Sequence, residues 1–275
     1  MTKTLVVGDT HLKQKIVLPR VDALVERHGA GRIVLLGDYC DEWHSTDDQL
    51  MDALYFLADW VDETRASGVQ VDVLLGNHDY QYLMGQEGPG THMRMVREVR
   101  ELLGDLDPAI AAEVDGFLLT HAGVTDSWAE RYLDEPGFAM TACDQLNALF
   151  EGGAQEDREA LFTCGAGRGG WDVPGPLWAD LSELSDDPCA GFDQIVGHTP
   201  VSTCGLVPMP PADALGESRK LAACDTFSLA SSLWPIGDAS MLLVEDGRLT
   251  VVGGEEGPAL TPWGYAVLDW TRSLF

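Results

Sequence analysis

The chain has 275 residues, and 45 Asp and Glu against 17 Lys and Arg give it a formal net charge of −28. So acidic a surface repels nucleic-acid backbones, which bind clustered basic residues, and we expect no nucleic-acid partner. No apolar run is long enough to cross a membrane, so we expect no membrane contact and a cytoplasmic protein. The length suits one globular domain, residues 1–275, and the sequence leaves the oligomeric state open.

The first half of the chain alternates short apolar runs with helical patterns. Apolar runs at 5–7, 33–36, 71–75 and 117–120 predict strands. Apolar spacing and end signals predict helices at about 19–28, 46–65 and 91–103, with Pro19 near the start of the first. This alternation predicts an α/β fold in which helices pack against a sheet.

The second half is less regular. Residues 126–190 are rich in Gly, Asp and Pro, with weak helical patterns near 141–150 and 155–162, and we expect this segment to be a cap or insertion beside the site. Strand patterns return at 194–196, 220–226, 240–246 and 248–253. Six cysteines are scattered without CxxC pairing, which is typical of reduced, packing thiols and makes a structural zinc site unexpected.

The predicted strands lead into five short polar motifs, each of which contains a glycine. The motifs are GDTH (8–11), GDYCD (37–41), GNHD (76–79), HAG (121–123) and GHT (197–199). Ligands of α/β sheets bind outside the carboxyl ends of strands, so these side chains are expected to converge. A glycine beside each polar residue permits a tight turn and close backbone approach.

The converging groups are carboxylates, an amide and imidazoles. This mixture suits Mn, Fe, Zn, Co or Ni better than Mg alone. The motifs offer too many ligands for one ion, so the sequence predicts two divalent metal ions that share a bridging carboxylate.

In their order along residues 8–199, the five motifs resemble those of the calcineurin-like metallophosphoesterases. The resemblance implies the αββα fold, a two-layer β-sandwich flanked by helices, and hydrolysis of a phosphate ester at two divalent metal ions, Mn being the first choice. Six motif residues match the ligand positions of the family. The implied metal ligands are Asp9 and His11 for the first ion, Asp38 as the bridge, and Asn77, His121 and His198 for the second.

The same resemblance assigns the remaining chemistry. A hydroxide bridging the two ions would attack phosphorus, and His78 would donate a proton to the leaving oxygen. Asp41 would orient His78, although an exposed loop acid is the competing interpretation of Asp41. Asn77 and His78 would thus face metal and substrate, and Asp79 would support the turn.

One departure from the pattern concerns phosphate binding. Phosphoprotein phosphatases of this superfamily carry Asp-Arg where this chain has Asp41-Glu42, so a phosphate-clamping arginine is missing. Arg168, in CGAGRGGWDVPGPLWAD, is similar to a second phosphate-binding arginine of that subgroup and is a candidate substitute. A planar guanidinium suits bidentate phosphate binding, but a plain surface loop is an equally good interpretation.

We rank the functions that the resemblance allows. A phosphomonoesterase acting on a small molecule or a phosphoprotein comes first. Nucleotide pyrophosphohydrolase or phosphodiesterase comes second. The short stretch THAGVTDSW resembles the corresponding stretch of bacterial dinucleoside-tetraphosphate hydrolases. A metal-free interaction scaffold is a distant third, since such relatives have broken ligand positions and all six are intact here.

Overall fold

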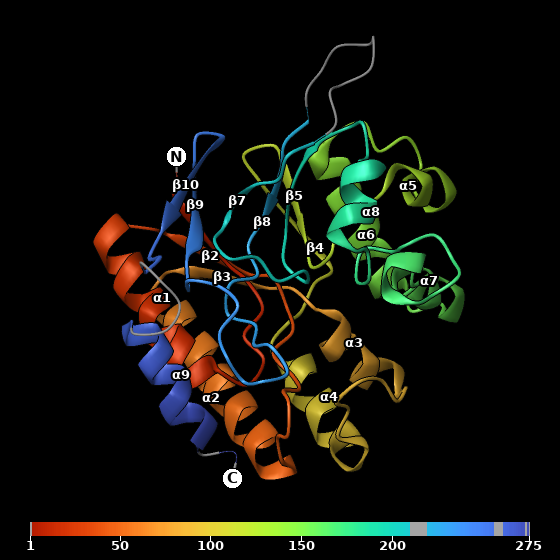
Figure 1. The fold of residues 1–275 in the computed structure, drawn as a ribbon. Coiled ribbons are helices and arrows are strands. Elements are labelled where there is room, and N and C mark those ends of the chain that lie inside the picture. Colours follow the sequence, from red (N-terminus) through yellow and green to blue (C-terminus); the bar gives the residue numbers. More distant parts are fainter. Residues whose placement is uncertain (1, 210–218, 256–260, 273, 275) are drawn as a thin grey trace.

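The strands of the computed structural model form two five-stranded sheets, in the orders β10-β9-β1-β2-β3 and β4-β5-β6-β8-β7. The structure describes residues 2–209, 219–255, 261–272 and 274 (Figure 1). The first sheet consists of β1 (Thr4–Val7), β2 (Arg32–Leu35), β3 (Gln70–Val73), β9 (Met241–Glu245) and β10 (Arg248–Val252). The second consists of β4 (Ala111–Val114), β5 (Phe117–Thr120), β6 (Asp193–Val196), β7 (Gly205–Leu206) and β8 (Leu221–Ala223).

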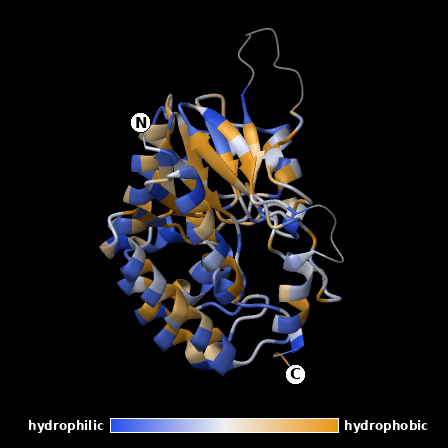
Figure 2. Cartoon of the chain, turned by 90° about the vertical axis from the view of Figure 1, so that its left-hand side faces the viewer, coloured by the Kyte–Doolittle hydropathy of each residue, from blue (hydrophilic) through white to orange (hydrophobic). Residues whose placement is uncertain are grey.

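The central strands β1, β5 and β8 are buried along their whole length, so nearly all of their residues are apolar. In β1, Leu5 and Val7 point into one core while Val6 points into another, which is the two-residue alternation of a strand. The core that holds Val6 lies between the two sheets and includes Phe117 and Ile195 from the second sheet. Figure 2 shows this interior as mostly hydrophobic strands surrounded by helices of mixed polarity.

Helices cover the outer face of each sheet. The core on the outer face of the first sheet is completed by α1 (Gln14–His28), α2 (Asp47–Ala66), α4 (Val96–Asp105) and α9 (Pro262–Arg272). The outer core of the second sheet takes side chains from α3 (Asn77–Met84), α5 (Asp126–Tyr132), α6 (Ala139–Gly152) and α7 (Gln155–Leu161), and α8 (Leu181–Asp186) adds a small cluster. The layers are therefore αββα, and the predicted two-layer β-sandwich flanked by helices is confirmed (Figure 1).

Three local predictions were incomplete. Helix α1 begins at Gln14 rather than near Pro19, and Pro19 lies inside it; the Lys15 carbonyl that loses its partner belongs to an exposed residue, which water can serve. Strand β4 was not predicted, because its sequence AAEV carries a weak pattern. Helix α3 was missed because its first turn consists of Asn77, His78 and Asp79, which the sequence analysis interpreted as a turn.

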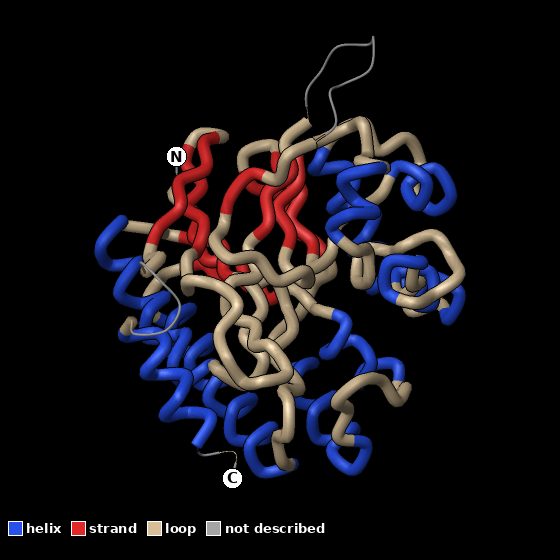
Figure 3. The backbone as a smooth tube through the Cα atoms, in the orientation of Figure 1, coloured by secondary structure: helices blue, strands red, loops and turns tan. Residues whose placement is uncertain are grey.

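The sheets are mixed, and their parallel strands place the loops. β1, β2 and β3 run parallel to one another, as do β5, β6 and β8. Figure 3 shows the loops, in tan, gathered at one end of both sheets. In the described part of the chain, no helix is long and apolar enough to cross a bilayer.

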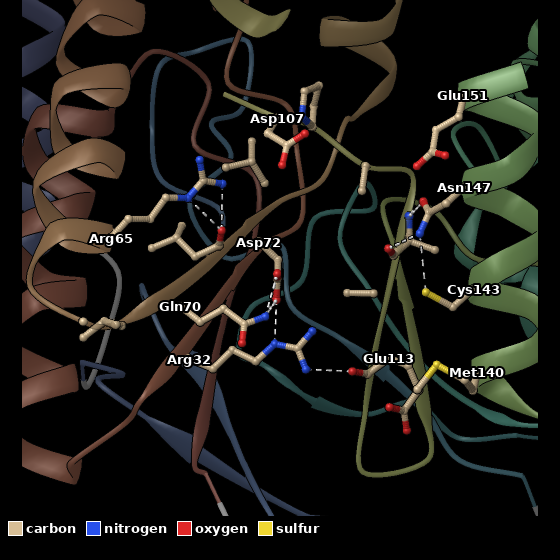
Figure 4. A pocket seen from close by; sticks show the side chains of 18 residues that line it. Arg32, Arg65, Gln70, Asp72, Asp107, Glu113, Met140, Cys143, Asn147 and Glu151 are labelled. Atoms are coloured by element: carbon tan, nitrogen blue, oxygen red, sulfur yellow. Dashed lines mark hydrogen bonds and ion pairs between the residues drawn. The ribbon is translucent and has the colours of Figure 1, made fainter. Parts of the chain in front are cut away.

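A cavity of about 890 Å³ lies elsewhere, along the edges of β3 and β4 beside α6 (Figure 4). Its polar groups are largely paired with one another. The Asn147 side chain accepts hydrogen bonds from the backbone N–H groups of Ile110 and Ala111, each at 3.0 Å, and donates one to the Ala111 carbonyl at 3.0 Å. Arg65 donates to the Val71 carbonyl of β3 at 2.8 Å. These side chains occupy strand-edge groups that would otherwise be open to pairing with another chain.

We expect Asn147→Ala to lower the free energy of unfolding by about 1–3 kcal/mol, because two buried N–H groups lose their acceptor. Urea unfolding measures this change. Glu151→Ala, on the same helix and beside the same cavity, is the control and should cost less than about 0.5 kcal/mol. Equal losses in the two variants would contradict the edge-capping role.

Candidate active site

Both sheets deliver their polar motifs to the same place. The exits of β1, β2 and β3 carry Asp9, Asp38 and Asn77, and those of β5, β6 and β8 carry His121, His198 and Asp225. Hydrogen bonds join the two sets: the His198 N–H donates to the Asp9 carboxylate at 3.0 Å. Five of the six ligand positions predicted from the sequence are therefore brought together, and the sixth, His11, lies 3.6 Å from Asp38.

The exits of β2 and β3 approach each other so closely that only glycine fits. Gly37 has φ +102°, and a Cβ there would lie 2.2 Å from the Gly76 nitrogen. A Cβ on Gly76 would lie 2.1 Å from Oδ1 of Asp38. These two contacts explain the glycines of the second and third motifs.

The Asp79 carboxylate fixes both of these exits. It accepts hydrogen bonds from the backbone N–H groups of Gly76, Asp38, Tyr39 and Cys40, at 2.7 to 3.1 Å. Asp79 stands in the first turn of α3, where acceptors of free N–H groups are favoured. It supports the turn, as expected, and it also shapes the loop that carries Asp38.

Several of the clustered residues have an unusual backbone. His11, Asp38, Asp41 and His198 have φ values of 40°, 54°, 61° and 63°, in the left-handed region. Asp and His adopt this region more readily than most residues, but each instance costs free energy that the surrounding contacts must offset.

Two groups of side chains have the geometry of metal ligands, and both contain Asp38. The groups are Asp9, His11 and Asp38, and Asp38, His121 and His198; in each, the potential ligand atoms all lie within 4.8 Å of one another. Asn77 adjoins the second group, with its Oδ1 2.9 Å from Nε2 of His121.

Hydrogen bonds to backbone carbonyls determine which ring nitrogen of a histidine is protonated and which keeps its lone pair. Nδ1 of His121 lies 2.9 Å from the Leu36 carbonyl and must donate to it, so Nε2 carries a lone pair. That lone pair faces oxygens of Asn77 at 2.9 Å and of Asp38 at 3.4 Å. Such a convergence of acceptors suits a cation.

The remaining two histidines support the same conclusion. In His11, Nδ1 lies 2.9 Å from the Asp41 carbonyl, which leaves Nε2 to face Asp38 at 3.6 Å. Nδ1 of His198 lies 3.0 Å from Nε2 of His121 and so faces the same cluster, while its Nε2 is buried without a hydrogen-bond partner among the described residues. These side chains therefore fit divalent ions with mixed oxygen and nitrogen ligands.

The side chains of the cluster repel one another electrostatically. Burial raises the pKa of Asp9 well above its usual range, and the charges of Asp225 and Asp38 raise it further. Burial likewise raises the pKa of Asp38 to about 8 and that of Asp225 to about 6. Burial lowers the pKa of His121 to about 3. Neutral imidazoles are the form that binds metal, and a bound cation would favour ionised carboxylates.

His78 differs from the other histidines because it is surrounded by acids. Its Nδ1 lies 3.0 Å from Oδ2 of Asp41. Burial lowers its pKa, but Asp38, Asp41 and Asp79 outweigh burial and raise the pKa to about 9. Asp41 is only 2% exposed, so it is not an exposed loop acid. It is held in turn by Tyr82 and Gln81, each at 2.6 Å.

A cavity of about 400 Å³ opens onto this cluster. His11, Asp38, Asn77, His78 and His198 line one part of it. Asp225 was not predicted to have a role, although it follows a strand as the other cluster residues do. Tyr82 was not predicted either, because its role depends on contacts that the local sequence does not show.

The segment 126–190 contributes Arg168 and Trp178 to the cavity wall. Arg168 Nη2 donates to Oγ1 of Thr199 at 2.7 Å, and Nε lies 3.0 Å from Oδ2 of Asp180. Both contacts are made by the Nε and Nη2 edge of the guanidinium, and Nη1 takes part in neither. Arg168 is thus held beside His198 rather than in a surface loop away from the cluster.

Comparison with known proteins agrees with this architecture. Residues 2–202 match the family model of the calcineurin-like phosphoesterases. No curated protein matches the chain. Among solved structures, the chain is similar to a cold-active protein-tyrosine phosphatase of a psychrophilic Shewanella species, with 21% identity, a TM-score of 0.57, and coverage of 91% of this chain and 77% of that one.

A further structure of a cold-active protein tyrosine phosphatase gives 17% identity, a TM-score of 0.55, and coverage of 92% of this chain and 79% of that one. At these identities the structural likeness concerns the fold. The family match, which spans most of the chain and includes every motif at the cluster, shows that this protein belongs to the calcineurin-like phosphoesterases and is a metal-dependent hydrolase of phosphoric esters.

Proposed function

We propose that this chain is a phosphomonoesterase that uses two divalent metal ions. The observation that carries the proposal is the pair of buried ligand groups that share Asp38 at the base of the 400 Å³ cavity. Asp9 and His11 would hold the first ion, Asp38 would bridge, and Asn77, His121 and His198 would hold the second. We infer Mn as the physiological metal, with Fe, Zn, Ni or Co as other candidates.

When bound, the ions would activate a water molecule as nucleophile and neutralise charge on the phosphoryl oxygens. The protein itself supplies the rest. Arg168, fixed by Thr199 and Asp180, would bind a phosphoryl oxygen with its remaining edge. His78, kept protonated by its acidic surroundings and oriented by Asp41, would donate a proton to the leaving oxygen.

A monoester is favoured over nucleotide polyphosphates by the charge of the cavity. Among the described residues that line it, Arg168 is the only arginine, and no lysine lines it. One such cation suits a single phosphoryl group, whereas a polyphosphate needs several. We also infer that residues 1–275 form one domain and that the protein is cytoplasmic. Within this domain, we infer that residues 126–190 form a cap, because Arg168 and Trp178 of this segment line the cavity.

The first prediction concerns substrate and metal together. With Mn²⁺, we expect the protein to hydrolyse a phosphomonoester at least tenfold faster than the matching diester. Asp38→Asn should abolish turnover and reduce the metal content of the purified protein, because it removes a ligand of both groups. Steady-state kinetics and elemental analysis measure these effects. Faster diester hydrolysis would favour the phosphodiesterase alternative. A wild-type protein that binds no metal would refute the proposed two-metal mechanism.

The second prediction concerns the proton donor. We expect His78→Ala to lower kcat on an alkyl phosphate by about 10²–10⁴-fold, the usual contribution of a general acid. The loss on nitrophenyl phosphate should be smaller, because that leaving group needs no proton. His28→Ala, at the distant end of α1, is the matched histidine control. Equal losses on both substrates would argue that His78 acts by some other means.

The third prediction concerns pH and stability. Burial raises the pKa of Asp38 from 3.8 to about 8, so at intermediate pH it is protonated in the folded chain and ionised in the unfolded chain. The contribution of Asp38 to the free energy of unfolding is therefore highest below about pH 4, where the carboxyl is protonated in both states. It falls as pH rises towards about 8, because ionising the buried carboxyl in the folded chain costs free energy. Relative to Asp38→Asn, metal-free wild-type protein should therefore lose melting temperature across this range.

Bound Mn²⁺ should reverse this loss and have its largest effect at the upper end of the range, where the carboxylates ionise most readily. Thermal unfolding with and without EDTA measures both trends. A metal-free difference between the two proteins that is independent of pH would refute the assignment of a buried, protonated Asp38.

A further inference from the structure

Trp43 is an exposed aromatic side chain at the cavity, and no role has yet been assigned to it. Trp43 is 51% exposed and lines the cavity that holds His78 and Arg168. Pro89, Pro200 and Leu229 line the same cavity and are apolar. Part of the cavity lining is therefore apolar.

Trp43 is held in this exposed position by contacts at both ends. Its indole Nε1 donates to the Leu229 carbonyl at 3.4 Å, and its backbone N–H donates to Oε1 of Glu42 at 2.8 Å. Glu42 is itself fixed by an ion pair with Lys13, whose side chain is completely buried. A large ring fixed while half of it faces water contributes little to the core, and such fixed apolar surface is typical of binding sites.

The Lys13–Glu42 pair also explains the acid at the position where related phosphatases have arginine. Because Lys13 neutralises it, Glu42 does not place an uncompensated negative charge beside the cavity. Its second oxygen orients Trp43. The position therefore supports an aromatic ring rather than a phosphate clamp.

The place of Trp43 along the chain limits what it can contact. It follows Asp41 by two residues, and Asp41 contacts His78 at 3.0 Å. Two residues span at most about 7 Å between Cα atoms, so the segment that carries Trp43 also carries the carboxylate that contacts His78, and all three residues line the same cavity. Arg168 reaches the cavity from the separate segment 126–190.

We propose that Trp43 is a specificity-determining residue that stacks against an aromatic leaving group, so that the preferred substrates are aryl phosphomonoesters. This inference rests on the proposed phosphomonoesterase function. The volume of about 400 Å³ is small among ligand sites and suits one ring plus one phosphoryl group.

The reaction balances with water as the only co-substrate. Water oxygen bonds to phosphorus as the bond between phosphorus and the aryl oxygen breaks. The electron pair of the broken bond stays on the aryl oxygen, which takes a proton and leaves as a phenol. The other product is inorganic phosphate.

The test compares phenyl phosphate, ethyl phosphate and adenosine 5′-monophosphate as substrates of the full-length protein loaded with Mn²⁺. The variants are Trp43→Ala, Trp43→Phe and, as matched control, Trp171→Ala, since Trp171 is fully exposed and does not line the cavity. We expect Trp43→Ala to lower kcat/KM for phenyl phosphate about three- to tenfold, mainly through KM, as for the loss of one aromatic pair.

The same variant should change kcat/KM for ethyl phosphate less than twofold. Trp43→Phe should keep most of the activity on phenyl phosphate, and Trp171→Ala should match wild type. Equal losses on phenyl and ethyl phosphate, or none on either, would overturn the role of Trp43 while the phosphomonoesterase stands. A larger loss on the nucleotide would also overturn it and identify a nucleobase platform. No wild-type turnover of any monoester, in protein shown to hold metal, would refute the proposed function and this inference together.

Discussion

The arrangement of the site depends on one buried carboxylate, that of Asp79. Four backbone N–H groups from two different strand exits donate to it. It thereby fixes Asp38, which belongs to both candidate ligand groups, relative to Asn77 and His78 at the start of α3. A neutral or shorter side chain could not satisfy four donors at once, and buried N–H groups without acceptors are costly.

Around this point the fold concentrates groups that repel one another. Asp9, Asp38 and Asp225 are each almost completely buried, and lone pairs of His121, Asn77 and Asp38 face the same space. Three apolar cores, one between the sheets and one on each outer face, provide the stability that can support such an arrangement. A site that is unfavourable when empty gains the most from cations, which links stability to metal binding.

The substrate side of the cavity is built by other parts of the chain. Lys13, at the start of α1, neutralises Glu42, and Glu42 orients Trp43. Arg168 comes from the 126–190 segment and is positioned by Thr199, two residues beyond Gly197. The residues that would hold metal thus lie at strand exits, while those that would select the substrate come from segments beyond them, as is common where one fold serves several substrates.

The sequence by itself determined the fold class and the composition of the cluster. Its apolar runs and the polar motifs that follow them are local patterns, and parallel strands bring their carboxyl ends to one edge, so Asp9, Asp38, Asn77, His121 and His198 could be predicted to meet. Only the tertiary structure decided the rest. Helix α3, the pairing of Lys13 with Glu42, the hold of Tyr82 on Asp41 and the exposure of Trp43 depend on contacts between residues far apart in the chain or on burial. Local periodicity carries no information about such contacts, since they are set by how the loops pack once both sheets are in place.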